Sequence, residues 1–227
     1  MSMTSLQGKR ILLTQSETFM GPMLEKVLTE QGAQVHADPR ALTDPSLPDQ
    51  LVQDAGEVDV LVANLGAPAP STAVADTTDE ELRSLFEHMV DPLPRLVRAV
   101  LPQMKQRGNG KILLMGSAAA LRGQKRSSSY SAARGAQLAY IQAVGVELAP
   151  LKIQANAIAQ NLVDNPTYFP PEIQALPKFQ ERIKREMPLG RLVAAEEDAH
   201  FAAYLCSDAA NCFVGQIFPV CGGWVPR

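Results

Sequence analysis

Residues 10–38 read RILLTQSETFMGPMLEKVLTEQGAQVHAD, and the fold class can be predicted from their pattern. Residues 10–14 and 34–37 are short runs rich in leucine, valine and isoleucine, which is typical of strands. Residues 20–30 between them have the longer apolar spacing of a helix, and Gly32 follows as a helix stop signal. A strand, a helix and a second strand in this order indicate a parallel sheet.

The same alternation continues along the chain. Further strands are predicted at residues 58–63, 111–115, 153–158 and 217–220. Helices are predicted at residues 79–104, where Pro92 and Pro94 should introduce a bend, and at 127–148, 179–187 and 198–206. This pattern predicts the α/β class: a single-domain, Rossmann-like, doubly wound parallel sheet with helices on both faces, spanning residues 1–227.

The interval between the second and third predicted strands is unusually short. Residues 39–57 carry Pro39, Pro45 and Pro48, and a crossover needs about a dozen residues including its helix. A nucleotide-binding half would normally place two crossovers and one more strand here. We therefore expect at least one helix to be missing from the half that would hold an adenosine.

Composition narrows the classes of partner and compartment. The net charge of −3 argues against a nucleic-acid partner. The longest apolar runs fall far below the roughly 20 residues that span a bilayer, and the N-terminus lacks an apolar signal core, so no membrane partner is expected. Cys206, Cys212 and Cys221 lack C-x-x-C spacing and are odd in number, which favours free thiols in a reducing compartment. We expect a soluble, cytoplasmic protein.

No protein-bound metal is expected, because the three histidines lack the spacing of metal ligands. The residues from 160 to 178 form a Pro-rich and aromatic segment that follows a predicted strand. Ligands in open α/β sheets bind at the carboxyl ends of the strands. Residues 160–178 are therefore the predicted substrate loop.

A serine, a tyrosine and an arginine form the most informative group of polar residues. Ser117 follows a predicted strand, and Arg134 lies one helical turn beyond Tyr130 on the same helix face. A tyrosine has a pKa near 10, and a permanently charged guanidinium beside it favours the phenolate. Singly, these residues are typical of a cap, a packing residue and a surface residue. Together they predict a base next to a hydroxyl donor.

The chain resembles the short-chain dehydrogenase/reductase superfamily over nearly its whole length. The resemblance rests on the stretches ILLT, VDVLVANLGA, AVLPQM, MPLGRL and GQIFPVCGGW, and on Ser117 and Tyr130. Family members have lysine at the position of Arg134, and that lysine also binds the nicotinamide ribose. In the family's phosphate loop, T-G-x-x-x-G-x-G, this chain has Gln15 and Phe19 in place of two glycines, and Glu17 adds a negative charge. Bulk and charge both oppose dinucleotide binding.

Two further positions bear on a nucleotide cofactor. Asp38 matches the acidic residue that would hold an adenosine ribose, and we interpret it as a relic or a turn residue. Met89 falls where the family has a catalytic asparagine. Asp38 taken alone would favour a nucleotide, but the changed loop and Met89 argue against one, so we expect no nucleotide cofactor.

Within that superfamily, the Ser, Tyr and Arg set, the aromatic residue in the first loop and the sequence AQNLVDNPTYF resemble the halohydrin dehalogenases. The resemblance implies a cofactor-independent lyase that converts vicinal haloalcohols to epoxides and halide. In reverse it implies epoxide opening by azide, cyanide or nitrite. Ser117 and Tyr130 would hold the substrate hydroxyl, and Arg134 would stabilise the phenolate. The halide and substrate pocket would comprise Phe19, Gln160, Asn161, Leu162, Val163, Tyr168 and Phe169.

Several alternatives stay open. Tyr168 and Phe169 could instead pin their loop to the core, and Trp224 could reach a neighbouring subunit or lie buried in its own. The protein could be an NAD(P)-dependent oxidoreductase with a drifted phosphate loop, or a non-catalytic ligand sensor. By resemblance, a homotetramer is expected through the helices predicted at 79–104 and 127–148.

Overall fold

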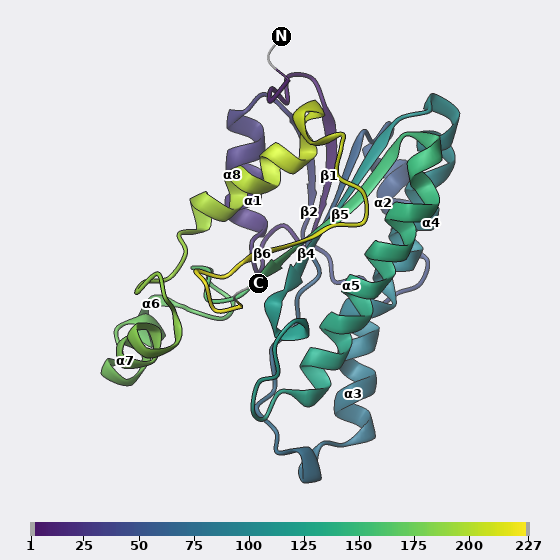
Figure 1. Ribbon diagram of the computed structural model, residues 1–227. Helices are drawn as coiled ribbons and strands as arrows, with labels where there is room; N and C mark the ends of the chain where they lie inside the picture. The colour runs from purple at the N-terminus through teal and green to yellow at the C-terminus, as the bar shows by residue number, and fades with distance from the viewer. Residues whose placement is uncertain (1–2, 226–227) are drawn as a thin grey trace.

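A six-stranded parallel sheet forms the centre of the computed structural model, which describes residues 3–225 (Figure 1). Its strand order is β2-β1-β3-β4-β5-β6. The strands are β1 (Arg10–Thr14), β2 (Gln34–Asp38), β3 (Val60–Ala63), β4 (Gly110–Ser117), β5 (Ile153–Gln160) and β6 (Ile217–Val220). The predicted fold class is confirmed; residues 1–2 and 226–227 of the predicted domain lie outside the described range.

Helices cover both faces of this sheet (Figure 1). One face carries α1 (Gly21–Glu30) and α8 (Ala195–Cys206), which pack against each other. The other face carries α2 (Leu47–Ala55), α4 (Pro92–Arg107) and α5 (Ser128–Leu148). Every residue of β4 and β5 is buried, because helices cover them on both sides. This burial explains why the central strands read as nearly continuous apolar runs.

The short interval between β2 and β3 contains a single helix, α2, and no further strand. The prediction of a missing helix is therefore confirmed. The helix α2 itself was not predicted, since its prolines argued against it. Pro48 lies in the first turn of α2, where a proline costs no hydrogen bond because the first amides of a helix have no partner within the helix.

The helix predicted at residues 79–104 is divided. A π-helical turn at Phe86–Val90 separates α3 (Asp79–Leu85) from α4. The backbone N–H of Asp91 donates to the carbonyl of Phe86 at 2.9 Å, five residues back, directly before Pro92, which has no N–H to donate. The division lies directly before Pro92, where the sequence predicted a bend.

Several predicted boundaries were wrong by a few residues. Ser117 and Gln160 are the last residues of β4 and β5, where they face each other in register, and do not follow the strands. Within the predicted loop 160–178, a short helix α6 (Pro171–Gln174) forms, and α7 (Pro177–Glu186) begins two residues earlier than predicted. Continued pairing of β4 with β5 explains the longer strands.

The helix α8 also begins earlier than predicted, at Ala195. The Glu197 carboxylate accepts a hydrogen bond of 2.8 Å from the backbone N–H of Ala194, which caps the first turn. Because the residue at the cap is alanine rather than serine, threonine or aspartate, the sequence lacked the usual start signal.

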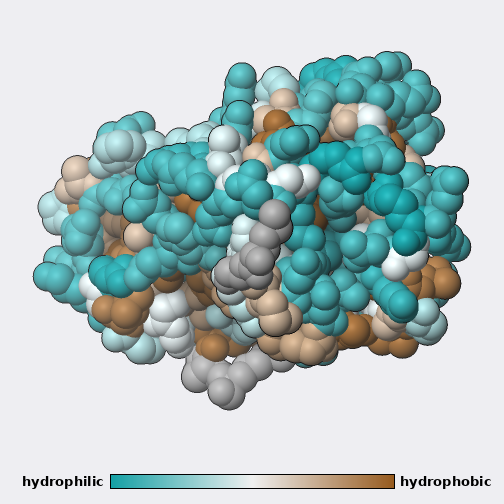
Figure 2. Space-filling model, turned by 90° about the horizontal axis from the view of Figure 1, so that it is seen from above, coloured by the Kyte–Doolittle hydropathy of each residue, from teal (hydrophilic) through white to brown (hydrophobic). Residues whose placement is uncertain are grey.

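The face seen in Figure 2 is mostly hydrophilic, with hydrophobic side chains in separate small areas. No helix within residues 3–225 combines the length and the apolar character needed to cross a bilayer. Over the same residues, no group of three His, Cys, Asp or Glu side chains is arranged to hold a metal ion. The three cysteines are free thiols, as predicted.

Substitution of Gly21 tests how tightly the first loop packs on α1. A Cβ atom at Gly21 would lie 2.2 Å from the carbonyl oxygen of Ser16, so Gly21→Ala should lower the free energy of unfolding by about 3 kcal/mol. A Cβ at Gly135 in α5 meets no atom within 4 Å, so Gly135→Ala should be neutral or stabilising by about 0.5–1 kcal/mol. Urea unfolding of both variants measures the difference; equal stabilities would contradict this packing.

Candidate active site

The carboxyl ends of β1, β4 and β5 open into a cavity of about 310 Å³. Apart from Arg134, every predicted site residue lines this cavity. These lining residues are Phe19, Ser117, Tyr130, Gln160, Asn161, Leu162, Val163, Tyr168 and Phe169. The fold therefore brings together a set that is spread over 150 positions of the chain.

Arg134 lies directly behind the cavity and is fully buried. Its Nε donates a hydrogen bond of 3.0 Å to the phenolic oxygen of Tyr130. Both residues lie on α5, one turn apart, as the sequence predicted. A charged donor at this distance stabilises a negative charge on the Tyr130 oxygen.

Nη2 of Arg134 donates to the Tyr168 hydroxyl at 3.4 Å, and Nη1 binds three acceptors in the core. Nη1 donates to the carbonyl oxygens of Leu65 at 2.8 Å and Met115 at 3.2 Å, and to Oε1 of Gln137 at 3.0 Å. Gln137 in turn donates to the carbonyl of Met89 at 2.6 Å, within the π-helical turn. The guanidinium is thus held by groups on several elements. Met89, the position where the resemblance implies asparagine, contributes only its backbone carbonyl to this network.

Two aromatic rings enclose the same guanidinium. Its Cζ lies 5.4 Å from the centre of the Phe19 ring and 5.2 Å from that of Tyr130. Burial alone lowers the pKa of Arg134, but the phenolic oxygens of Tyr130 and Tyr168 outweigh it and raise that pKa above its usual value. Arg134 is therefore a fixed charge and cannot exchange a proton during a reaction.

Ser117 presents a hydroxyl to the cavity with its proton available. Its Oγ accepts a hydrogen bond of 3.2 Å from the backbone N–H of Ala119. A hydroxyl that accepts one bond can still donate its own hydrogen. Ser117 can therefore donate to an oxygen bound between it and Tyr130.

The first loop keeps the backbone shape of a glycine loop without the glycines. Gln15 and Phe19, which replace two glycines, both have left-handed conformations, with φ of 47° and 53°. This conformation is strained for residues with a Cβ atom. The Phe19 N–H is bound by Thr167 Oγ1 at 2.6 Å, and its ring packs edge-on against Tyr168 at 5.4 Å. Phe19 thereby becomes a wall of the cavity.

A dinucleotide does not fit these residues. The amide N–H of Gly21, at the start of α1, already donates to the carbonyl of Thr18, and Pro22 has no N–H to offer a phosphate. The carboxylate of Asp38 is bound by the guanidinium and backbone N–H of Arg40, so it has no free place for a ribose hydroxyl. Asp38 was interpreted as a relic or a turn residue; it is the last residue of β2, and Arg40 occupies its carboxylate.

The segment after β5 offers donors that suit an anion, although not all of those predicted. The Asn161 N–H is taken by Val220 O at 3.1 Å, and the Gln160 amide is bound to Asp198. No hydrogen bond within the described structure accounts for the N–H groups of Leu162 and Val163. The side-chain amide nitrogen of Asn161 is also buried without a partner. These three donors remain for a ligand.

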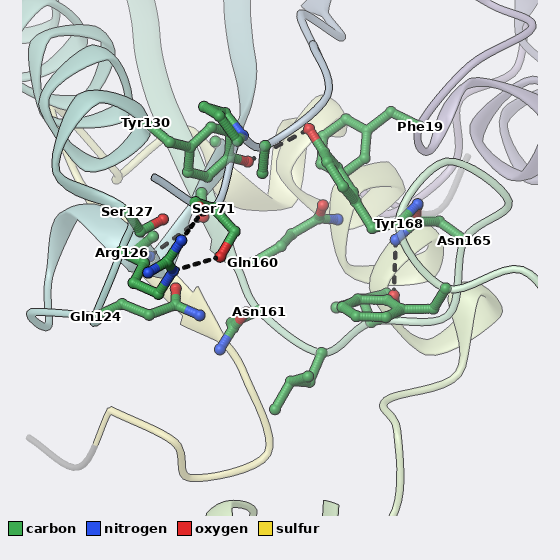
Figure 3. A pocket seen from close by; sticks show the side chains of 18 of the residues that line it. Phe19, Ser71, Gln124, Arg126, Ser127, Tyr130, Gln160, Asn161, Asn165 and Tyr168 are labelled. Carbon is green, nitrogen blue, oxygen red and sulfur yellow. Dashed lines mark hydrogen bonds between the residues drawn. The ribbon is translucent and has the colours of Figure 1, made fainter. Parts of the chain in front are cut away.

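Tyr168 contributes to the site differently from its predicted role. Its hydroxyl donates to Ala67 O at 2.7 Å and lies 3.4 Å from the Tyr130 oxygen, so it faces the predicted base (Figure 3). Burial and the neighbouring Tyr130 raise the pKa of Tyr168 above its usual value, although Arg134 opposes this. Tyr168 therefore stays a neutral phenol. Phe169 packs on Phe179 of α7 at 5.6 Å, which also anchors the loop to the core.

A buried carboxyl group supports the floor of the cavity. Asp198 on α8 accepts a hydrogen bond from Nε2 of Gln160, while its other oxygen and the Gln160 Oε1 have no partner. Burial raises the pKa of Asp198 to about 7, although the Gln160 amide lowers it. A proton on the free Asp198 oxygen would give both unpaired atoms a partner, as in an acid–amide pair.

Sequence reasoning missed three residues of this site. Gln137 and Asn165 act as struts: the Asn165 side chain bridges Val163 O and Tyr168 N. Arg126 lines the cavity with a φ of 59°. Backbone strain therefore gathers at the site, since Phe19, Arg126 and Leu162 line it and all have positive φ. Of the three residues that were missed, only Asn165 could have been identified from the sequence, because an Asn-Pro pair is a turn signal.

Trp224 is buried within its own subunit. It is 3% exposed, and the Arg122 guanidinium stacks 4.7 Å from its ring centre and donates to its carbonyl at 2.6 Å. Of the two alternatives for Trp224, burial in its own subunit is the one that the structure shows.

Comparison with known proteins gives two kinds of relative. A family model for enoyl-(acyl carrier protein) reductase matches residues 7–225. A cis-4-hydroxycyclohexanecarboxylate dehydrogenase of Sinomonas cyclohexanicum is 32% identical over 181 residues, covering 79% of this chain and 70% of that protein. Reductases and dehydrogenases are the commoner sequence relatives.

Two solved structures of dehalogenating proteins are also similar. A dehalogenation enzyme is 31% identical, with a TM-score of 0.92, covering 97% of this chain and 99% of that one. A halohydrin dehalogenase bound to ethyl (2S)-oxiran-2-ylacetate is 26% identical, with a TM-score of 0.85, covering 94% and 96%.

The Asp198 carboxyl should make stability depend on pH. Its pKa of about 7 exceeds the ordinary value, so the folded state binds more protons than the unfolded state between about pH 4 and pH 7. Stability should fall as pH rises through this window, by as much as about 4 kcal/mol. In Asp198→Asn, which cannot ionise, this loss should disappear. Denaturant unfolding from pH 4 to 8 measures it, with the exposed Asp76→Asn as the charge control. Parallel curves for Asp198→Asn and the native protein would contradict the assignment.

Proposed function

The chain belongs to the short-chain dehydrogenase/reductase family, and we propose that it is a halohydrin dehalogenase that needs no nucleotide cofactor. One observation carries the proposal: Tyr130 is paired with a fully buried Arg134 beside a cavity that Phe19 closes where a glycine loop would admit a dinucleotide. The likeness to two dehalogenating structures supports it.

The reaction begins at the substrate hydroxyl. Ser117 donates a hydrogen bond to the hydroxyl oxygen, and the Tyr130 phenolate takes the hydroxyl proton. Arg134 stabilises the phenolate through its bond at 3.0 Å and does not itself titrate. A positioned base of this kind contributes about 10²- to 10⁴-fold in rate.

Ring closure then needs no redox step. The alkoxide oxygen attacks the neighbouring carbon from the side opposite the halogen, a carbon–oxygen bond forms, and the carbon–halogen bond breaks. The halide leaves with the electron pair of that bond, and the proton on Tyr130 passes to water. Holding the oxygen and the leaving group in line gives the orientational part of the acceleration.

The departing halide would be held by the unpaired donors after β5. These are the N–H groups of Leu162 and Val163 and the side-chain amide of Asn161. The positive edge of the Phe19 ring suits a large, weakly hydrated anion. Because the reaction is reversible, azide, cyanide and nitrite should enter the same pocket and open epoxides.

The proposal includes a cytoplasmic homotetramer assembled through the α3–α4 segment and α5. On α5, the apolar side chain of Val146 is 69% exposed in the single chain, as expected for a residue that a second copy covers.

The competing function is an NAD(P)-dependent oxidoreductase, which the commoner sequence relatives favour. Against it stand the strained Gln15 and Phe19, the occupied Gly21 amide and the paired Asp38 carboxylate. A non-catalytic sensor would have no need of a fully buried cation bonded to Tyr130.

Halide release tests the proposed activity directly. The native protein should release bromide from 1-bromo-2-propanol without added nucleotide, and should form an azidoalcohol from propylene oxide and azide. Tyr130→Phe should lose about 10²-fold or more of kcat because the phenyl ring cannot accept the proton. Tyr140→Phe, on the same helix but outside the cavity, serves as the control. Bromide release by Tyr130→Phe at the native rate would exclude the mechanism.

Nucleotide binding separates the proposal from its main competitor. Isothermal titration with NADH and NADPH should give no binding at concentrations up to about 1 mM, because Phe19 walls the loop, the Gly21 N–H is already bonded and Pro22 has no N–H for a pyrophosphate. Micromolar binding of either nucleotide, with reduction of a ketone, would favour the oxidoreductase.

A further inference from the structure

The cavity beside Tyr130 has a one-sided charge. Its lining includes the cationic side chains of Lys125, Arg126 and Arg182 and no aspartate or glutamate. The whole chain has a net charge of −3, so the positive charge of the cavity lining is opposite in sign to the net charge of the chain. A cleft lined by charges of one sign attracts ligands of the opposite sign.

Arg126 is fixed in place beside this cavity. Its backbone has a φ of 59°, and its carbonyl accepts a hydrogen bond of 3.1 Å from the N–H of Thr72. Its guanidinium donates to the Ser71 carbonyl at 2.9 Å and to the Ser71 Oγ at 3.3 Å. Figure 3 shows these two bonds on the side of the pocket away from Tyr168. A strained residue that is bonded through both its backbone and its side chain to residues 71–72 is a built feature of the site.

The charge of Arg126 is not neutralised by the protein. Within residues 3–225, neither Arg126 nor Lys125 forms an ion pair with a carboxylate. The nearby carboxylate of Glu81 is bound by the hydroxyls of Thr72 and Ser129. Arg182, in contrast, pairs with Glu186 at 3.1 Å and contributes less. Two unpaired cations therefore remain at the cavity.

A neutral haloalcohol leaves these cations without a role. The base already has its own cation in Arg134, which is not part of the lining. A guanidinium presents its donors in a planar fork that matches a carboxylate, and an adjacent ammonium adds a second charge. Because Arg126 and Lys125 line the same cavity as Ser117 and Tyr130, they suit a carboxylate on a substrate whose hydroxyl lies at those two residues.

We propose that the preferred substrates are haloalcohols that carry a carboxylate group, which Arg126 and Lys125 bind while Ser117 and Tyr130 hold the hydroxyl. This inference rests on the proposed dehalogenase function and names its substrate class. The product is the corresponding epoxy acid: the hydroxyl oxygen closes on the halogen-bearing carbon, the halide leaves, and the carboxylate is unchanged.

A matched pair of substrates tests the proposal. Chloride release is measured from 4-chloro-3-hydroxybutanoate and from its uncharged amide, which has nearly the same shape. The native protein should give a kcat/KM at least about 10-fold higher for the acid, as expected for a charge-assisted hydrogen bond. The difference should lie in KM, because the carboxylate contacts are the same before and during ring closure.

Variants of the two cations identify the residues responsible. In Arg126→Gln, the ratio of kcat/KM for the acid to that for the amide should fall about 10-fold. The Lys125 side chain has no hydrogen bond or ion pair to any residue from 3 to 225, so Lys125→Gln repeats the test without disturbing the loops, with an expected fall of a few-fold. Arg83→Gln removes the same charge from an exposed position on α3, outside the cavity, and should leave the ratio unchanged.

The possible results separate a failure of the carboxylate inference from a failure of the proposed dehalogenase function. Chloride release from the amide with no preference for the acid would overturn the inference and leave the dehalogenase function standing. The inference would also fail if Arg126→Gln slowed azide opening of a neutral epoxide but left the acid-to-amide ratio unchanged, since the cations would then serve the free anion. Release from neither substrate, nor from 1-bromo-2-propanol, would overturn the dehalogenase function itself.

Discussion

The site depends on one interaction: the guanidinium of Arg134 is fully buried and bonded to the Tyr130 oxygen at 3.0 Å. A buried charge is costly unless hydrogen bonds satisfy it, and Leu65, Met115 and Gln137 supply those bonds. Because these acceptors follow β3, lie in β4 and lie on α5, the cation fixes these elements around the base. Arg134 therefore serves both the packing of the core and the proposed stabilisation of the Tyr130 phenolate.

The first loop illustrates how a fold can be kept while its ligand changes. Gln15 and Phe19 hold the left-handed backbone that glycines adopt without strain. The retained Gly21 has no room for a Cβ because the loop carbonyls pack on the helix start. The ring of Phe19 then packs on Arg134 and Tyr168. In place of a glycine loop that could bind a phosphate, this chain has an aromatic side chain that lines the cavity. The strained backbone of this loop is confined to Gln15 and Phe19.

Most of the fold was predictable from the sequence, because apolar periodicity determines which segments are strands and which are helices. The exceptions have local causes. The helix α2 was hidden by its prolines, and the predicted long helix is divided by a π-helical turn, whose place Pro92 indicates but whose form it does not. The pairing of Tyr130 with Arg134 was also predictable, since a spacing of four residues places two side chains on one helix face.

The order of the strands, the base with its cation and the loss of the glycine loop could be predicted from the amino-acid sequence, because each depends on residues close together in the chain. Four features could be known only from the folded chain: which donors remain for an anion, the approach of Tyr168 to Tyr130, the bond between Asp198 and Gln160, and the position of the unpaired Arg126 at the cavity. The residues that these contacts join lie far apart in the chain: Tyr130 and Tyr168 are separated by 38 positions, and Ser71 and Arg126 by 55. Their partners are chosen by packing and by competition for hydrogen bonds, which chain spacing does not encode.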